Sequence, residues 1–185
     1  MRARAGRAGS AGRAVGRPVT PAELERCFAE LSLEPEGRGE REDDASWDLR
    51  LDGRRRFDIR LTVILDRAVG AIVWVPLAPP IKDYHRKAYR RLLRWSDEFP
   101  FAKFSLTPDE RPLLVVEVVG DRLDRDELGT AIARALVICD LLLEEVAGWA
   151  WIGGRVPDWS ERTSRGAALI DRFADRLGEL ATVGA

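Results

Sequence analysis

Two neighbouring segments near the middle of the chain carry the clearest patterns of apolar and polar residues. Apolar side chains occupy every odd position from residue 57 to residue 65, and the even positions between them are mostly polar. This alternation predicts a strand with one face on a core. Residues 69–77 are apolar on both faces, and residues 66–68 supply a short turn between the two segments. We therefore predict a β-hairpin around which the rest of the fold is arranged.

Three apolar residues of this hairpin fall on the face opposite the predicted core: Ile64, Ile72 and Trp74. Apolar side chains on that face need a cover, which either the C-terminal helix or a partner provides. In the first case the protein is a closed structural domain. In the second case the three residues belong to a binding surface, so we name them as candidate peptide-binding residues.

The chain before the hairpin predicts a helix, a loop and a further strand. A capping box at residues 20–23, with proline at the first helical position, predicts a helix that ends near Leu33. The acidic, glycine-bearing run at 34–44 has little to bury and predicts a solvated loop. Residues 46–51 alternate between apolar and polar, which predicts a strand, and Asp52-Gly53 predicts the turn after it.

The chain after the hairpin alternates between helical and strand periodicity. The apolar stripe of its longest helix is wider than one sheet face usually covers, so the excess should meet either the C-terminal segment or a second subunit. The predicted elements are a helix at 83–97, strands at 101–106 and 113–119, a long helix from Asp124 to about Trp149, and a last helix that begins after Asp158.

The order of these elements defines the fold class. It is α-β-β-β-α-β-β-α with a C-terminal helix added. We expect an α+β fold in which an antiparallel sheet of about five strands has helices on one face. Trp149, Trp151 and Trp159 cluster near the last helix and are expected to pin it to the body of the protein.

A basic stripe follows the polar face of the predicted helix at 83–97 and consists of Arg86, Arg90 and Arg94. The ordinary interpretation is a solvated helix face, because arginine greatly outnumbers lysine throughout the chain, as codon bias produces. The functional interpretation is contact with an acidic or C-terminal part of a partner peptide, so we add these arginines to the candidate peptide-binding residues.

The formal net charge of −1 hides an uneven distribution, because residues 1–18 contain five arginines and no acid. This composition predicts a disordered basic arm. The arm lacks the aromatic residues that stack on bases, so we do not favour nucleic acid as a partner. Charges interrupt every apolar run well before the roughly 20 residues of a membrane helix, and no secretory signal follows the basic start. We expect a cytoplasmic protein without a membrane partner.

No combination of residues in the sequence predicts catalysis, a metal site or a cofactor. His85 is the only histidine, and Cys27 and Cys139 lie in helical patterns that predict buried reduced thiols. The chain lacks the motifs of serine hydrolases, zinc proteases, phosphate-binding loops and dithiol redox sites. We therefore predict no catalytic residues, no metal, no cofactor and no enzymatic activity.

The element order, together with three segments, resembles the YbjN-like family, whose fold is similar to type III secretion chaperones. The segments are Arg90 to Leu106, Arg111 to Leu136 and Ile138 to Val146. This resemblance implies a peptide-binding, chaperone-like role without chemistry, often in dimers. We divide the chain into a basic arm at 1–18, a YbjN-like domain at 19–149 and a helical extension at 150–185.

Three hypotheses for function follow. The first is a chaperone-like module that binds a protein or peptide client through Ile64, Ile72 and Trp74. The second is a structural or regulatory homodimer that is built on the long helix and holds no client. The third is a nucleic-acid-associated protein that uses the basic arm with the arginine stripe. We favour the first, in a homodimer.

Overall fold

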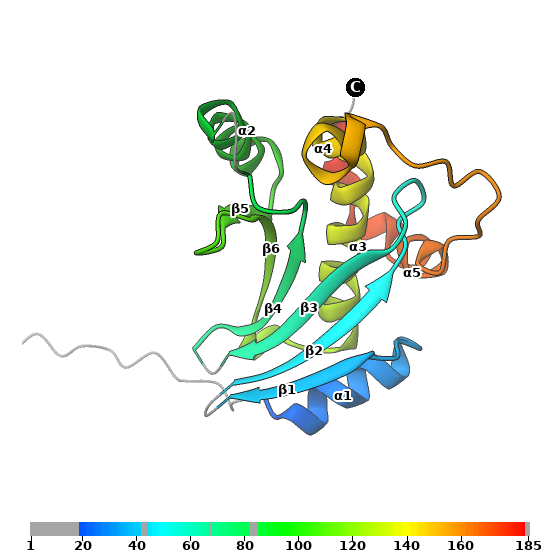
Figure 1. The fold of residues 1–185 in the computed structure, drawn as a ribbon. Coiled ribbons are helices and arrows are strands. Elements are labelled where there is room, and N and C mark those ends of the chain that lie inside the picture. Colours follow the sequence, from blue (N-terminus) through cyan, green and yellow to red (C-terminus); the bar gives the residue numbers. More distant parts are fainter. Residues whose placement is uncertain (1–18, 42–43, 67, 82–84, 184–185) are drawn as a thin grey trace, which may run out of the picture.

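Within the residues that the structure describes, the strands form one six-stranded antiparallel sheet, and the helices gather on one side of it (Figure 1). The structure, a computed structural model, describes residues 19–41, 44–66, 68–81 and 85–183. The strands are β1 (Gly37–Arg41), β2 (Asp44–Leu51), β3 (Ile59–Asp66), β4 (Gly70–Pro76), β5 (Lys103–Leu106) and β6 (Pro112–Val119). The helices are α1 (Pro21–Glu30), α2 (His85–Glu98), α3 (Arg125–Leu141), α4 (Leu143–Ala150) and α5 (Ala167–Arg172). The α+β class and the antiparallel sheet are confirmed.

The predicted hairpin is present as β3 and β4 in the centre of the sheet, whose strand order is β1-β2-β3-β4-β6-β5. Its turn is closed by Asp66, whose Oδ1 accepts hydrogen bonds from the backbone N–H groups of Ala68 and Val69 at 2.8 Å each. The middle residue of that turn, Arg67, lies outside the described residues, as does the predicted arm at 1–18.

Two of the three helix starts that local capping predicts are confirmed. Thr20 and Glu23 form the reciprocal capping box at α1, in which the Thr20 backbone N–H donates to Glu23 Oε2 at 2.9 Å. Asp124 Oδ1 accepts from the N–H groups of Asp126 and Glu127 at 2.8 Å each and so caps α3. These contacts satisfy N–H groups that have no partner inside the helix.

The core lies between α3 and the sheet face that the odd positions of β3 form. Leu61 and Val63 of β3 and Leu114 and Val116 of β6 are almost completely buried on that face. Leu128, Ile132 and Leu136 of α3 are equally buried. The odd-numbered face of the hairpin is therefore the core face, as the alternation predicts.

The prediction of a solvated loop at 34–44 is wrong in part, because β1 occupies residues 37–41. β1 pairs with β2 along its whole length, from Gly37 opposite Asp48 to Arg41 opposite Asp44. The side chains of Arg38 and Glu40 are exposed, and Arg38 forms an ion pair with Glu25 at 3.0 Å. This edge strand pairs with β2 through its backbone and contains no apolar residue, so the sequence shows no apolar alternation there.

The long predicted helix is two helices, since α3 ends and α4 begins around Leu142, which has φ −86° and ψ 1°. The helical hydrogen bonds from Leu142 N to Ile138 O and from Val146 N to Leu142 O remain at 2.9 Å. The apolar period therefore continues across the break, and the sequence gives no sign of it.

The prediction that the last helix begins after Asp158 is also wrong. Asp158 accepts from the backbone N–H of Ser160 at 3.0 Å, but this contact closes an isolated turn. An irregular segment follows, and α5 begins only at Ala167, before short 3₁₀ turns complete the described chain. The same Asp contact occurs in turns and in helix caps, so the local sequence does not separate the two.

The C-terminal segment covers the far side of α3. Leu177 and Leu180 are buried and lie beside Val137 and Leu141, which belong to the wide apolar stripe of that helix. The sequence left two covers open for this stripe, the C-terminal segment and a second subunit. The structure shows that the C-terminal segment covers it. No helix in the described part of the chain combines the length and the apolar character that a membrane span requires.

Candidate functional site

The sheet face opposite α3 carries a contiguous set of apolar side chains. Ile64 of β3 lies directly opposite Ile72 of β4, and Trp74 of β4 lies directly opposite Val115 of β6. Leu113 lies two positions before Val115 on β6 and therefore shares its face. We call these five residues the outer apolar patch. Leu113 and Val115 are buried, whereas Trp74 is 38% exposed, so the indole brings the patch to the surface.

The described helices lie on the other side of the sheet, and they leave this face without a helical cover (Figure 1). Even α2, at the β5 edge, packs on the core side: its Trp95 contacts Phe104 of β5, whose partner on β6 is the core residue Leu114. The C-terminal segment packs on α3. The hypothesis that the C-terminal helix covers Ile64, Ile72 and Trp74 is therefore wrong.

Paired polar residues border the outer apolar patch on both sides. Thr62, beside Trp74 on β3, donates a hydrogen bond to Asp48 of β2 at 2.6 Å. Lys103, on β5, forms an ion pair with Glu117 of β6 at 2.6 Å. An apolar centre inside a polar rim is the usual composition of a protein-binding surface.

Two arginines lie opposite one another at one end of this face, because the register pairs Arg50 of β2 with Arg60 of β3. Arg50 is neutralised by Glu36 at 3.0 Å. Arg60 is exposed and forms no ion pair with any residue that the structure describes. Like charges opposite one another in a sheet repel, so an acidic group from outside would be favourable here.

The arginine stripe lies elsewhere. Arg86, Arg90 and Arg94 line an open hollow of about 850 Å³ between α2 and α4, on the helical side of the sheet. Arg91, in the same hollow, forms an ion pair with Glu145 of α4. The structure thus brings Ile64, Ile72 and Trp74 together and brings the three arginines together, but in two separate places.

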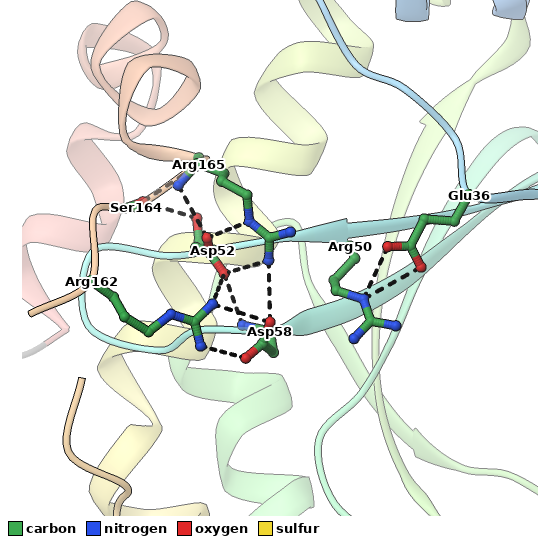
Figure 2. A network of polar contacts seen from close by, with 8 residues as sticks. Glu36, Arg50, Asp52, Asp58, Arg162, Ser164 and Arg165 are labelled. Carbon is green, nitrogen blue, oxygen red and sulfur yellow. Dashed lines mark hydrogen bonds and ion pairs between the residues drawn. The ribbon is translucent and has the colours of Figure 1, made fainter.

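A buried carboxylate that sequence reasoning placed in an ordinary turn holds the C-terminal segment to the sheet. Asp52 is 0% exposed, and its two oxygens accept from Arg165 Nε at 2.7 Å and Arg165 Nη2 at 2.9 Å (Figure 2). Asp52 also accepts from the backbone N–H of Asp58 at 2.8 Å and of Arg165 at 3.1 Å. Figure 2 shows Arg162 beside Arg165, both directed at this carboxylate and at Asp58.

A second buried carboxylate holds the same β2–β3 connection from the helix side. Asp140 of α3 accepts from three successive backbone N–H groups, those of Arg54 at 2.6 Å, Arg55 at 3.0 Å and Arg56 at 2.7 Å. Gly53 permits this approach, because a Cβ at that position would lie 2.2 Å from Asp140 Oδ1. Asp52 and Asp140 together hold the β2–β3 connection in place, with the C-terminal segment on one side of it and α3 on the other.

The tryptophan cluster completes this attachment. Trp159 packs against Phe57 with ring centroids 5.5 Å apart, and against Trp151 at 5.7 Å. Trp149 packs against Trp95 at 5.6 Å. The expectation that these tryptophans pin the C-terminal part to the body is confirmed, although Trp159 holds an irregular segment instead of a helix.

Acid is expected to weaken this attachment through Asp52. Burial alone would raise the pKa of Asp52, but hydrogen bonds from Arg165 and from backbone N–H groups outweigh burial and lower the pKa from 3.8 to about 2. Because the folded pKa is the lower one, the stabilisation is present above pH 3.8 and is lost as the pH falls towards 2. The shift corresponds to about 2 kcal/mol.

Urea unfolding as a function of pH measures this effect. The wild type is expected to lose more unfolding free energy than Asp52→Asn over the acid range, since the variant has no carboxylate to protonate. Equal losses in the two proteins would show that Asp52 does not contribute.

Neither cysteine forms a disulfide in the structure. Cys139 is completely buried, and burial raises the pKa of its thiol to about 11. Cys27 is half-buried, and its pKa is also raised, chiefly by burial. Within the described residues no three His, Cys, Asp or Glu side chains are grouped closely enough to hold a metal ion.

The fold and the surface together define an α+β domain with helices on one sheet face and an apolar patch on the other. The chain belongs to the YbjN family: residues 20–147 match it, and the family is described as "Putative bacterial sensory transduction regulator". The family resemblance of the sequence is thereby confirmed. The matched residues extend from the cap of α1 into α4, and Arg162 and Arg165 lie outside them. A comparison with curated proteins found no match.

Proposed function

We propose that this protein is a non-enzymatic regulator that binds a segment of another protein on its outer apolar patch. The family description supports a regulatory role. The observation that carries the proposal is the exposed Trp74 among Ile64, Ile72 and Val115 on a sheet face that the described helices leave open. Tryptophan is enriched among the residues that dominate binding energy at protein interfaces.

The charges on this face specify the chemistry of the partner segment. The apolar patch favours apolar side chains at its centre. Arg60 at one end has no ion-pair partner among the described residues, so it favours an acidic residue there. An amphipathic segment with apolar residues and a neighbouring acid meets both requirements, and this is a chaperone-like mode of binding. We keep as a prediction that Arg86, Arg90 and Arg94 contact a further acidic part of the same partner.

Replacing Trp74 by aspartate is expected to abolish partner capture while the protein stays folded. The aspartate places a charge in the patch, and removing an indole that is 38% exposed, and therefore mostly buried, should cost about 2 to 3 kcal/mol of unfolding free energy. Affinity purification followed by mass spectrometry compares the proteins captured by wild type and by the variant. Trp74→Thr tests the same contact with a residue that strands favour.

Leu93→Asp is the matched control, because Leu93 is a 73% exposed apolar residue of α2 on the helical side of the molecule. The proposal requires specific proteins that wild type and Leu93→Asp capture and both Trp74 variants lose. Equal capture by all four proteins would contradict it. Light scattering tests a homodimer other than the one predicted on the long helix: if a second copy of the chain covered the patch, wild type would be a dimer and Trp74→Asp a monomer.

A further inference from the structure

A pocket of about 580 Å³ lies at the open end of the β3–β4 hairpin, opposite its turn. There the β2–β3 connection meets the chain after α4. It is lined by three arginines, Arg56, Arg60 and Arg111, and by the aromatic side chains of Trp151 and Trp159. The two tryptophans follow the residues that match the YbjN family. The pocket therefore combines the matched domain with the C-terminal addition.

Arg56 is a buried guanidinium in the wall of this pocket. The residue is only 8% exposed, its Nη2 donates to the backbone oxygen of Leu77 at 2.8 Å, and its Nη1 has no hydrogen-bond partner among the described residues. The Trp151 ring lies 5.5 Å from its Cζ. A buried cation without an anionic partner is unfavourable, so an anion in the pocket would be stabilised by it.

The charges around Arg56 increase this preference for an anion. Arg60 is free of ion pairs with described residues, and Arg111 has only a long contact of 3.6 Å with Asp109. The acid in the pocket wall, Asp58, is already engaged by Arg162 at 2.5 Å and by Arg165 at 3.2 Å. The pocket therefore carries an excess of positive charge.

The aromatic walls favour a planar ligand body. Trp151 and Trp159 are half-buried and meet edge to face, with 70° between their ring planes, so part of each ring remains accessible. Planar rings stack on such surfaces, and a pocket of this volume is within the usual range for small molecules.

We infer that this pocket binds a small organic anion, with a carboxylate or phosphate group on the arginines and a planar ring against the tryptophans. Benzoate and adenosine monophosphate are the two probes, and they distinguish carboxylate from phosphate chemistry. Benzamide and adenosine are their neutral counterparts. Calorimetric titration of the full-length protein measures the affinities.

Saturable binding of benzoate or adenosine monophosphate is expected, with the neutral counterpart binding at least about tenfold more weakly, because charge-assisted hydrogen bonds to arginine are lost. Arg60→Gln and Arg111→Gln are each expected to weaken binding by about tenfold. Both side chains are accessible, so their replacement tests the pocket without removing the buried Arg56. Arg155→Gln, at an exposed arginine outside the pocket, should bind like wild type.

Three results would overturn the inference: no saturable binding of either anion, equal binding of the neutral counterparts, or wild-type affinity in both Arg60→Gln and Arg111→Gln. Trp74→Asp should retain the affinity for these anions, because Trp74 does not line the pocket. Because Arg60 borders both sites, the two proposals are separated by Trp74→Asp, which changes only the protein-binding surface, and by Arg111→Gln, which changes only the pocket.

Discussion

Asp140→Ala is expected to lower the free energy of unfolding by about 4 kcal/mol. The Asp140 carboxylate accepts from the backbone N–H groups of Arg54, Arg55 and Arg56 at 2.6, 3.0 and 2.7 Å. Asp140 is only 7% exposed. Its removal leaves these three N–H groups without an acceptor beside the core. Each hydrogen bond to a charged acceptor contributes more to stability than a hydrogen bond to a neutral acceptor.

Urea denaturation measures this loss, and two further variants show its origin. Asp140→Asn keeps one amide oxygen as an acceptor and should retain part of the stability. Asp171→Ala removes an acid that pairs with Arg54 of the same connection but is exposed, so it should change the unfolding free energy little. A loss for Asp140→Ala no greater than that for Asp171→Ala would contradict the role given to the buried carboxylate.

Gly166→Ala is expected to detach the C-terminal segment and to lower the free energy of unfolding by about 3 kcal/mol. A Cβ at this buried position would lie 2.0 Å from the backbone oxygen of Asp52 and 3.0 Å from Leu136 Cδ1. The nearest atom belongs to the backbone of the β2–β3 connection and has no rotamer that relieves the clash. The contacts between Asp52 and Arg165, the residue before Gly166, should break as well.

Gly178→Ala is the matched control, because a Cβ at Gly178 would meet no atom within 4 Å. Urea denaturation gives the stability of each variant, and limited proteolysis reports whether residues after Trp151 become accessible. Gly166→Ala should be cleaved there faster than wild type, and Gly178→Ala should not. Equal stability and equal cleavage of the two variants would show that the close approach of Gly166 to Asp52 is not required.

The sequence predicts those parts of the fold whose interactions join neighbours in the chain. The capping box of Thr20 and Glu23 and the N-cap of Asp124 each join residues two or three positions apart. The alternation in β3 results from the pleat of a strand that is buried on one side, so it also specifies the opposite face. For this reason the sequence correctly predicts that Ile64, Ile72 and Trp74 share one face.

The remaining parts depend on contacts between distant residues or leave no apolar pattern. Asp52 and Arg165 are 113 positions apart, so the sequence shows only an aspartate before a glycine and predicts an ordinary turn. β1 is held by backbone hydrogen bonds to β2 and buries little. The spacing of Arg86, Arg90 and Arg94 specifies a helix face, but it does not say where that helix packs, and the arginines therefore proved distant from the outer apolar patch.

The proposed protein-binding surface is tested most directly by a photo-crosslinking amino acid placed at position 72, in the middle of the outer apolar patch, with the same amino acid at position 93 as the control. Ile72 is half-buried beside Trp74, so a partner held on the patch lies within reach. Mass spectrometry identifies each adduct. The account predicts that the crosslinker at position 72 forms a covalent adduct with a protein other than this chain, and that the crosslinker at position 93 forms none. No adduct from position 72, or an adduct only with a second copy of this chain, would contradict it.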